Sequence, residues 1–295
     1  MGSSSEPRER STTHRSGAKP HIRLRRVTPT DLAALIRAAA TDVLSGRGLG
    51  ADVLPVEIDI ARPRNPAHGD YATSLALRTA KRAGVAPLEL ASWLVDDLSR
   101  RAGIATAEVA GPGFVNLRLA AAARGALVGE VLAAGEGYGG AAPALADTLA
   151  SEPLVAKTLA SWLADSVDDS PAYRVRYAHA RLASVARQAG DLGMFPGTGY
   201  HLLAHPTEGE LIRTLGEYPA VVRAAAQPPA PHRVARYLQA LVAACHRFED
   251  SCQVLPKGDE PINDLYRARL ALCAAARQVL GNGLGLLGVS APERM

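Results

Sequence analysis

The sequence is short of lysine and of aromatic residues. Lysine occurs only at positions 19, 81, 157 and 257, although Lys and Arg together number 33. Aromatic residues make up only 4% of the 295 residues, so alanine and leucine must fill most of any core. The net charge of +4 is therefore carried mainly by arginine, whose planar guanidinium makes bidentate contacts with phosphates and stacks on bases. A genome that favours arginine codons explains the same bias, so composition alone does not establish a polyanionic partner.

The chain also has few cysteines and no long apolar run. Cys245, Cys252 and Cys273 lie in sequence with helical periodicity, and no two of them form a CxxC pair. We therefore expect buried thiols in a reducing cytoplasm and no disulfide framework. There is no run of eighteen apolar residues and no signal-peptide core after the N-terminus, so the sequence predicts no membrane span and a cytoplasmic protein.

No motif predicts a metal site, a cofactor site or a catalytic constellation. His201 and His205 have i, i+4 spacing, but no third ligand is near them, so zinc binding is not expected. His68 and Asp70 could suggest acid–base chemistry, yet packing by His68 and helix capping by Asp70 are the preferred interpretation. The glycine-rich segment 135–140 ends a helix and opens none, so it does not predict a phosphate-binding loop.

Residues 28–120 predict a small α+β domain after a polar, disordered leader over residues 1–27. Thr30 is a good N-cap for an amphipathic helix that ends near Gly46. The other elements expected in this domain are a strand over residues 56–60, a loop that runs into a helix over residues 62–73, a helix that begins near Pro87, and a turn followed by an alternating strand over residues 109–119.

The rest of the chain shows only helical patterns. Residues 121–168 predict a helical linker, with an alanine-rich helix up to residue 134 and a flexible stretch over residues 141–146. Residues 169–295 predict an all-α bundle. Residues 207–210 (Thr-Glu-Gly-Glu) predict a capping box. Two apolar stripes follow, one of Val234, Leu238, Leu241, Cys245, Phe248 and Cys252, the other of Leu265, Leu272, Val279 and Leu280.

Several segments resemble arginyl-tRNA synthetases, in the order in which that family has them. The segments His68–Thr73 and Val109–Asn116 resemble the family's N-terminal additional domain. Tyr177–Arg181 resembles the opening of its anticodon-binding domain, the DALR domain, and Ala230–Arg233, His246–Phe248 and Ser290–Met295 resemble later parts of it. The resemblance implies an α+β domain that contacts the tRNA elbow, followed by an all-α bundle of the DALR anticodon-binding type.

The catalytic core of that family has no counterpart in this sequence. Only about fifty residues separate Leu119 from Tyr173, whereas a doubly wound ATP-binding domain requires on the order of 150. No His-x-Gly-His segment is present, and none of the four lysines lies in a Lys-Met-Ser-Lys-like loop. In the family these motifs stabilise the phosphate charge that develops during adenylate formation. We therefore expect no catalytic residues, no cofactor and no arginine activation by the chain alone.

The resemblance places Phe114 and Asn116 at the D-loop of a tRNA. This placement is chemically reasonable, because unstacked loop bases are read by aromatic stacking and by amide hydrogen bonds to their edges. The alternative is that Phe114 packs in the core and Asn116 caps a turn.

A second candidate surface lies on the helix that begins near residue 171. Its side chains form a polar and aromatic stripe suited to an anticodon stem-loop, and arginines flank it for phosphate contacts. The alternative is a solvated basic face whose tyrosines pack on the bundle. The resemblance also places Met295 near the anticodon. The stripe is Tyr173, Tyr177, Arg181, Ser184 and Gln188, and the flanking residues are Arg174, Arg176 and Arg187.

These inferences predict a tRNA-binding protein without its own aminoacylation core, acting as an adaptor or chaperone of arginine tRNA for a separate catalytic or tRNA-modifying enzyme. One alternative is a degenerate or split arginine–tRNA ligase that uses ATP only with a separate catalytic subunit. Another is a protein-interaction module whose RNA surfaces have decayed. The expected partner is tRNA, with no membrane and no metal.

Overall fold

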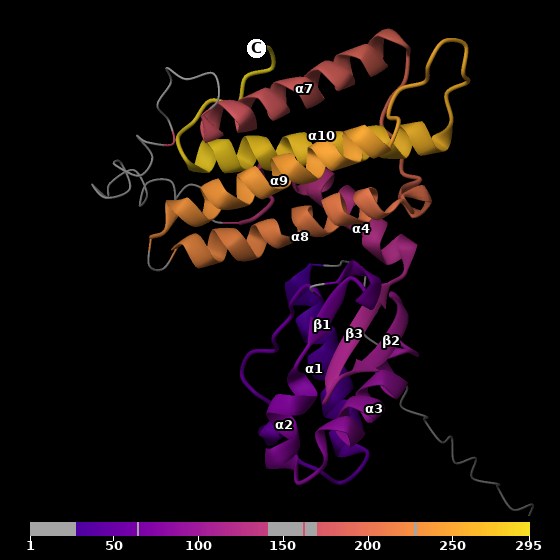
Figure 1. Cartoon of the computed structure of the whole chain (residues 1–295), viewed down its shortest axis with the longest axis vertical. Coiled ribbons are helices and arrows are strands. Elements are labelled where there is room, and N and C mark those ends of the chain that lie inside the picture. Colours follow the sequence, from indigo (N-terminus) through magenta and orange to yellow (C-terminus); the bar gives the residue numbers. More distant parts are fainter. Residues whose placement is uncertain (1–27, 64, 141–161, 163–169, 227–228) are drawn as a thin grey trace, which may run out of the picture.

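The computed structural model describes residues 28–63, 65–140, 162, 170–226 and 229–295. They form an α+β domain and an all-α bundle, which lie one below the other in Figure 1 and confirm the predicted fold class. The predicted leader and the predicted flexible stretch over residues 141–146 fall outside the described residues. None of the helices described combines the length and the apolar character that a membrane span requires.

The N-terminal domain is a three-stranded antiparallel sheet with helices packed on one face. The strand order is β1-β3-β2, and Leu117 in the central strand lies opposite Tyr71 on one side and Ala107 on the other. The elements are α1 (Pro29–Ser45), η1 (Ala51–Val53), η2 (Pro66–His68), β1 (Tyr71–Thr73), α2 (Leu75–Ala83), α3 (Pro87–Leu98), β2 (Ile104–Ala110) and β3 (Phe114–Leu119).

The N-cap of the first helix lies two residues before the predicted cap. Thr28 is its N-cap: the hydroxyl of Thr28 accepts the backbone N–H of Asp31 at 3.2 Å, and the Asp31 carboxylate accepts the backbone N–H of Thr28 at 3.3 Å. Pro29 follows at the first helical position, where its missing N–H has no helical partner to lose. Thr30 is therefore inside the helix, and the prediction that it caps the helix is wrong.

The predicted strand over residues 56–60 is also wrong. These residues are irregular, Val56 is 95% exposed, and only the neighbouring Ala61 forms a bridge, with Ala72. The strand lies instead at Tyr71–Thr73, within the segment predicted as a loop. A three-residue strand is too short to show alternation, so its pairing with β3 decides its conformation.

The bundle is built around α10, which packs against each of the other bundle helices. The first predicted apolar stripe is confirmed, because all six of its residues are buried. In the second stripe Leu265 is only half-buried, whereas the other three residues are buried. The elements are α4 (Ala121–Ala134), η3 (Gly135–Gly137), α7 (Pro171–Asp191), η4 (Tyr200–Leu202), α8 (Pro206–Ala226), α9 (Pro231–Ser251) and α10 (Asp264–Leu286).

The start of α8 uses a different acidic residue from the one predicted. The carboxylate of Glu208 accepts the backbone N–H of His205 at 2.8 Å, which satisfies a donor just before the helix. The same carboxylate is buried and pairs with Arg269 at 2.7 Å. Glu210, the acidic residue of the predicted box, instead pairs with Arg247 at 2.7 Å.

A proline inside α8 removes one helical hydrogen bond. A side chain from the segment that follows α4 replaces it. Pro219 has no N–H, so the carbonyl of Leu215 lacks its helical donor. The hydroxyl of Tyr138 donates to that carbonyl at 3.1 Å, and its ring stacks on Tyr218 at 6.1 Å. Asn282 of α10 also donates to the carbonyl of Gly135 at 2.9 Å. The glycine-rich segment after α4 is thus anchored in the bundle.

Candidate nucleic-acid interface

One face of β3 is open to solvent. Val115, Leu117 and Leu119 point into the domain core, and the alternating residues Phe114 and Asn116 lie on the opposite face. Phe114 is 42% exposed, so it does not pack in the core. Asn116 lies opposite Ala72 and Glu108 within the sheet, so it caps no turn. The alternative interpretation, in which Phe114 packs in the core and Asn116 caps a turn, is therefore wrong.

The turn before β3 sets the position of Phe114. Gly111 and Gly113 both have positive φ, at 51° and 136°, and a Cβ on Gly113 would lie 3.0 Å from the side chain of Pro87. Glycine is therefore required for the chain to reverse close to α3. Because β3 runs from this turn toward α4, Phe114 lies at the end of the domain that is remote from the bundle.

The predicted stripe on α7 faces away from the bundle core. Ser170 caps the helix, since its hydroxyl accepts the backbone N–H of Tyr173 at 3.1 Å. The rings of Tyr173 and Tyr177 stack on each other at 6.3 Å with an interplanar angle of 18°. Tyr177 is 45% exposed, so its ring is available to a base in solution.

The polar residues of the stripe are already engaged with one another or with α9. Arg181 donates to the carboxylate of Glu249 at 2.9 Å, and this hydrogen bond raises the pKa of Arg181. The amide of Gln188 lies 3.4 Å from the hydroxyl of Ser184. A phosphate at Arg181 would thus share the guanidinium with Glu249.

The last residues of the chain lie against α7. Arg187 donates to the carbonyl of Glu293 at 3.0 Å, and the Nδ1 atom of His179 lies 2.8 Å from the carbonyl of Pro292. A carbonyl oxygen only accepts, so Nδ1 of His179 is the donor in this contact. Burial lowers the pKa of His179. These contacts bring the exposed Met295 to the side of the bundle that carries α7.

The flanking arginines differ in their exposure. Arg174 is exposed and lines a shallow cavity of about 290 Å³ together with Gln239 and His246 of α9. Arg176 is half-buried. The structure thus gathers the predicted residues of α7 and Met295 on one side of the bundle, whereas Phe114 and Asn116 lie on β3 of the other domain.

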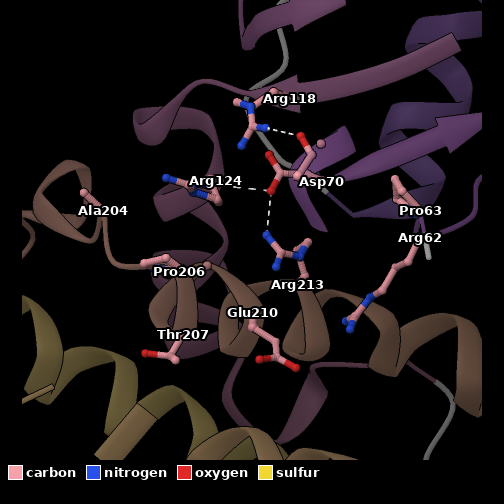
Figure 2. A pocket seen from close by; sticks show the side chains of 13 residues that line it. Arg62, Pro63, Asp70, Arg118, Arg124, Ala204, Pro206, Thr207, Glu210 and Arg213 are labelled. Carbon is pink, nitrogen blue, oxygen red and sulfur yellow. Dashed lines mark hydrogen bonds and ion pairs between the residues drawn. The ribbon is translucent and has the colours of Figure 1, made fainter. Parts of the chain in front are cut away.

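Asp70 makes a contact between the two domains. The sequence analysis did not predict any contact of this kind. Gly69 has a φ of 122°, and a Cβ there would lie 2.7 Å from the carbonyl of Leu117, so only glycine allows this approach to β3. Asp70 is then buried, where its carboxylate accepts the backbone N–H of Leu119 at 2.8 Å and a guanidinium N–H of Arg213 in α8 at 2.5 Å (Figure 2).

The roles predicted for His68 and Asp70 are both wrong. His68 is exposed, and Asp70 lies before β1, where it caps no helix. Ser74 occupies the N-cap position of α2, and its backbone N–H is bound by Asp59 at 3.0 Å. The only signal in the sequence was the His-Gly-Asp-Tyr segment itself, which the family resemblance already included.

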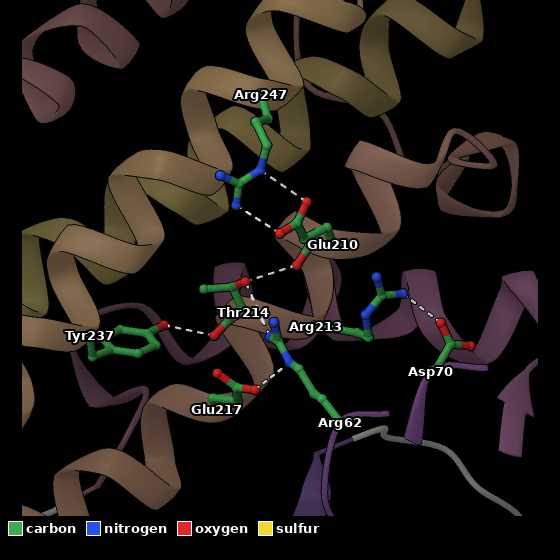
Figure 3. A network of polar contacts seen from close by, with 8 residues as sticks. All are labelled: Arg62, Asp70, Glu210, Arg213, Thr214, Glu217, Tyr237 and Arg247. Carbon is green, nitrogen blue, oxygen red and sulfur yellow. Dashed lines mark hydrogen bonds and ion pairs between the residues drawn. The ribbon is translucent and has the colours of Figure 1, made fainter. Parts of the chain in front are cut away.

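Arg62 makes a second link between the domains (Figure 3). Its Nε atom pairs with Glu217 at 2.5 Å, and a terminal nitrogen donates to the hydroxyl of Thr214 at 3.2 Å. Burial raises the pKa of Glu217, and the charge of Arg62 opposes that rise. Arg223 of α8 adds a hydrogen bond to Thr30 at 2.9 Å. The N-terminal domain and the bundle thus meet through charged side chains.

Two family models match the chain. The arginyl-tRNA synthetase N-terminal domain matches residues 30–119, and the DALR anticodon-binding domain matches residues 175–295.

Three solved structures are similar to parts of the chain. A Campylobacter jejuni protein assigned as an arginyl-tRNA synthetase has 23% identity, covering 46% of this chain and 29% of its own, with a TM-score of 0.37.

The other two structures are arginyl-tRNA synthetases. That of Thermus thermophilus has 32% identity over 44% of this chain and 22% of its own, with a TM-score of 0.35. That of Plasmodium falciparum has 21% identity over 41% of this chain and 21% of its own, also with a TM-score of 0.35. The chain thus spans less than a third of the length of each structure that it resembles.

Proposed function

We propose a function from the premise that this chain is an arginyl-tRNA synthetase-like protein with an N-terminal domain and a DALR anticodon-binding domain. The chain binds one tRNA at two places, with Phe114 and Asn116 at the elbow and the face of α7 at the anticodon arm. It acts as an adaptor or chaperone for arginine tRNA and delivers it to a separate enzyme in the cytoplasm.

The observation that carries this proposal is the placement of the two surfaces. β3 begins at Phe114 and leads into α4 of the bundle, so Phe114 lies at the end of β3 remote from the bundle. α7 lies on the side of the bundle remote from the N-terminal domain (Figure 1). The elbow and the anticodon loop are likewise far apart on a tRNA, so a protein that contacts both needs separated surfaces. Exposed aromatic rings at both places supply the stacking that single-stranded loops require.

The proposal includes the absence of an aminoacylation centre. The two family matches leave residues 120–174 between them, and the helix described there, α4, packs against α8 and α10. This segment is far shorter than the roughly 150 residues of a doubly wound ATP-binding domain. We expect no arginine-dependent exchange of pyrophosphate into ATP by the purified chain, with or without tRNA. Exchange above that of a heat-inactivated sample contradicts this part of the proposal.

Footprinting of arginine tRNA on the purified chain tests the binding mode. Protection of the D-loop and the anticodon loop on the same molecule is the expected result. Protection of the anticodon arm alone shows that the N-terminal domain serves another partner, and absence of both footprints contradicts the proposal. A tRNA for another amino acid is the control, because weaker protection of that tRNA establishes preference for arginine tRNA.

The adaptor role needs a separate test in the native cell. The tagged chain is captured together with its bound RNA and proteins, and both are sequenced. Enrichment of arginine tRNAs together with one tRNA-modifying or tRNA-charging enzyme is the expected outcome. Enrichment of proteins without any tRNA instead identifies a protein-interaction module.

A further inference from the structure

A cavity of about 570 Å³ lies where the two domains meet (Figure 2). Its walls come from the loop before β1, from β3 and α4, and from the first two turns of α8. None of the residues assigned to the elbow or to the anticodon arm lines it. The cavity therefore belongs to neither of the two surfaces proposed above.

Three guanidinium groups in this cavity surround one carboxylate. Arg213 pairs with Asp70 at 2.5 Å, and Arg124 of α4 reaches the same carboxylate oxygen at 3.9 Å. Among the described residues, Arg118 of β3 donates only to a backbone carbonyl, that of Ala67, at 3.0 Å. One carboxylate cannot neutralise three guanidinium groups, so the cavity carries an excess of positive charge.

The other charged residues of the cavity wall are paired elsewhere. The carboxylate of Glu210 binds Arg247 in a bidentate manner, at 2.7 and 3.1 Å, and points away from the cavity (Figure 3). Arg62 pairs with Glu217. Neither residue offsets the positive excess around Asp70.

One hydrogen-bond donor of a residue that lines the cavity has no acceptor among the described residues. The Nε atom of Arg124 is buried and meets no acceptor among the described residues. Buried N–H groups in folded proteins are nearly always paired, so such a donor points to an acceptor that is supplied from outside. Thr207 and Gly209 bring the N-terminal end of α8 to the same cavity, and the positive end of its dipole favours an anion.

We infer that this cavity binds a phosphate anion, either a backbone phosphate of an RNA or the phosphates of a free oligophosphate. A phosphate offers several acceptor oxygens to the guanidinium groups of Arg118, Arg124 and Arg213, which suit planar, bidentate recognition. The anion competes with Asp70 for Arg213, so its binding is coupled to the contact between the domains. This inference goes beyond the proposed function, because it requires neither tRNA surface.

Calorimetric titration of the full chain with inorganic pyrophosphate tests the site directly. Arg118→Gln is the informative variant, because Arg118 is exposed and takes no part in the Asp70 pair, so folding is retained. Loss of one charge-assisted contact weakens binding roughly ten- to a hundred-fold. Arg82→Gln is the matched control: Arg82 is also exposed, donates to a backbone carbonyl at 3.1 Å and lies outside the cavity.

A second variant separates an anion site from a purely structural ion pair. Asp70→Asn keeps an oxygen that can accept the N–H of Leu119 but removes the charge that competes for Arg213. The anion site predicts tighter pyrophosphate binding and a melting temperature that pyrophosphate restores. A purely structural pair predicts a lower melting temperature that pyrophosphate leaves unchanged, and this result overturns the inference.

Titration with arginine tRNA distinguishes the two sources of phosphate. If the site takes an RNA phosphate, Arg118→Gln weakens tRNA binding and pyrophosphate competes with tRNA. If it takes a free oligophosphate, Arg118→Gln weakens pyrophosphate binding and leaves tRNA binding unchanged. Equal binding of both probes by the wild type and by Arg118→Gln overturns the inference, whereas the tRNA footprints test the proposed function independently.

Discussion

The carboxylate of Asp70 accepts a hydrogen bond from the guanidinium of Arg213 across the boundary between the two domains. The side chains are only 2% and 15% exposed, so water screens the pair poorly. A buried charge that loses its partner is costly, because the remaining charge stays desolvated. This pair therefore favours a fixed arrangement of the domains, in which α7 lies on the side of the bundle remote from the N-terminal domain (Figure 1).

Arg213→Ala is expected to lower the free energy of unfolding by about 3–5 kcal/mol, because it leaves Asp70 buried without its closest counter-charge. Urea unfolding of the full chain measures this loss. The matched control is Arg223→Ala on the same helix, whose exposed guanidinium contacts Thr30 and whose loss changes stability by less than about 0.5 kcal/mol. Equal losses for the two variants contradict the importance of the Asp70 pair.

Tyr138→Phe is expected to cost about 1–2 kcal/mol of stability, because it removes the donor for the Leu215 carbonyl that Pro219 leaves unpaired. A double-mutant cycle with Pro219→Ala provides the control. The alanine in that variant supplies a backbone N–H to the Leu215 carbonyl, so Tyr138→Phe costs less in that background. Identical costs in the two backgrounds rule out this compensation.

Binding of arginine tRNA is expected to weaken steeply with salt. Contact with about four to six phosphates gives a slope of roughly −3 to −5 in a plot of log affinity against log salt concentration. Arg181→Ala reduces the magnitude of this slope by about one if its guanidinium meets a phosphate while it remains paired with Glu249. A flat salt response, or equal affinity for an unrelated acidic polymer, counts against recognition of tRNA.

Phe114→Ala is expected to weaken tRNA binding by about 1–3 kcal/mol through the loss of one base stack. Stability changes little, because the ring is already 42% exposed. The matched control is Phe195→Ala, which removes another exposed ring outside both proposed surfaces. If both variants bind tRNA like the wild type, Phe114 does not stack on a base.

Stability is expected to fall as the pH drops below about 6.5, which is the ordinary pKa of a histidine side chain. Burial lowers the pKa of His179 in the folded state, so the unfolded chain binds more protons in this range. The effect is absent well above the ordinary pKa, grows as the pH falls from that value toward the lowered pKa, and levels off below the lowered pKa. Thermal unfolding from pH 7.5 to 5 measures it.

His179→Gln is the variant that removes this part of the pH dependence, since glutamine does not titrate and can still donate to Pro292. His232→Gln, at an exposed histidine, is the control and keeps the wild-type profile. An unchanged profile in His179→Gln assigns the pH dependence to other groups.

The sequence predicted the bundle helices well because their signals are local. The apolar spacing from Val234 to Cys252 recurs once per turn of a helix, and every residue of that stripe is buried. The alternation of β3 likewise predicted a strand, although it left open whether Phe114 packs in the core. Such periodicities follow from the geometry of one element and need no information from the rest of the chain.

The sequence also determined the family, through the motifs of both domains, and the types of residue at the candidate surfaces. Only the tertiary structure decided which side chains meet. The strand at Tyr71–Thr73 depends on pairing with Leu117, and its three residues carry no pattern of their own. The pair between Asp70 and Arg213 joins residues 143 positions apart, and no local periodicity can indicate such a contact. The domain boundary and its arginine-lined cavity therefore arise from packing, because charges distant in the chain become neighbours only after both domains have folded.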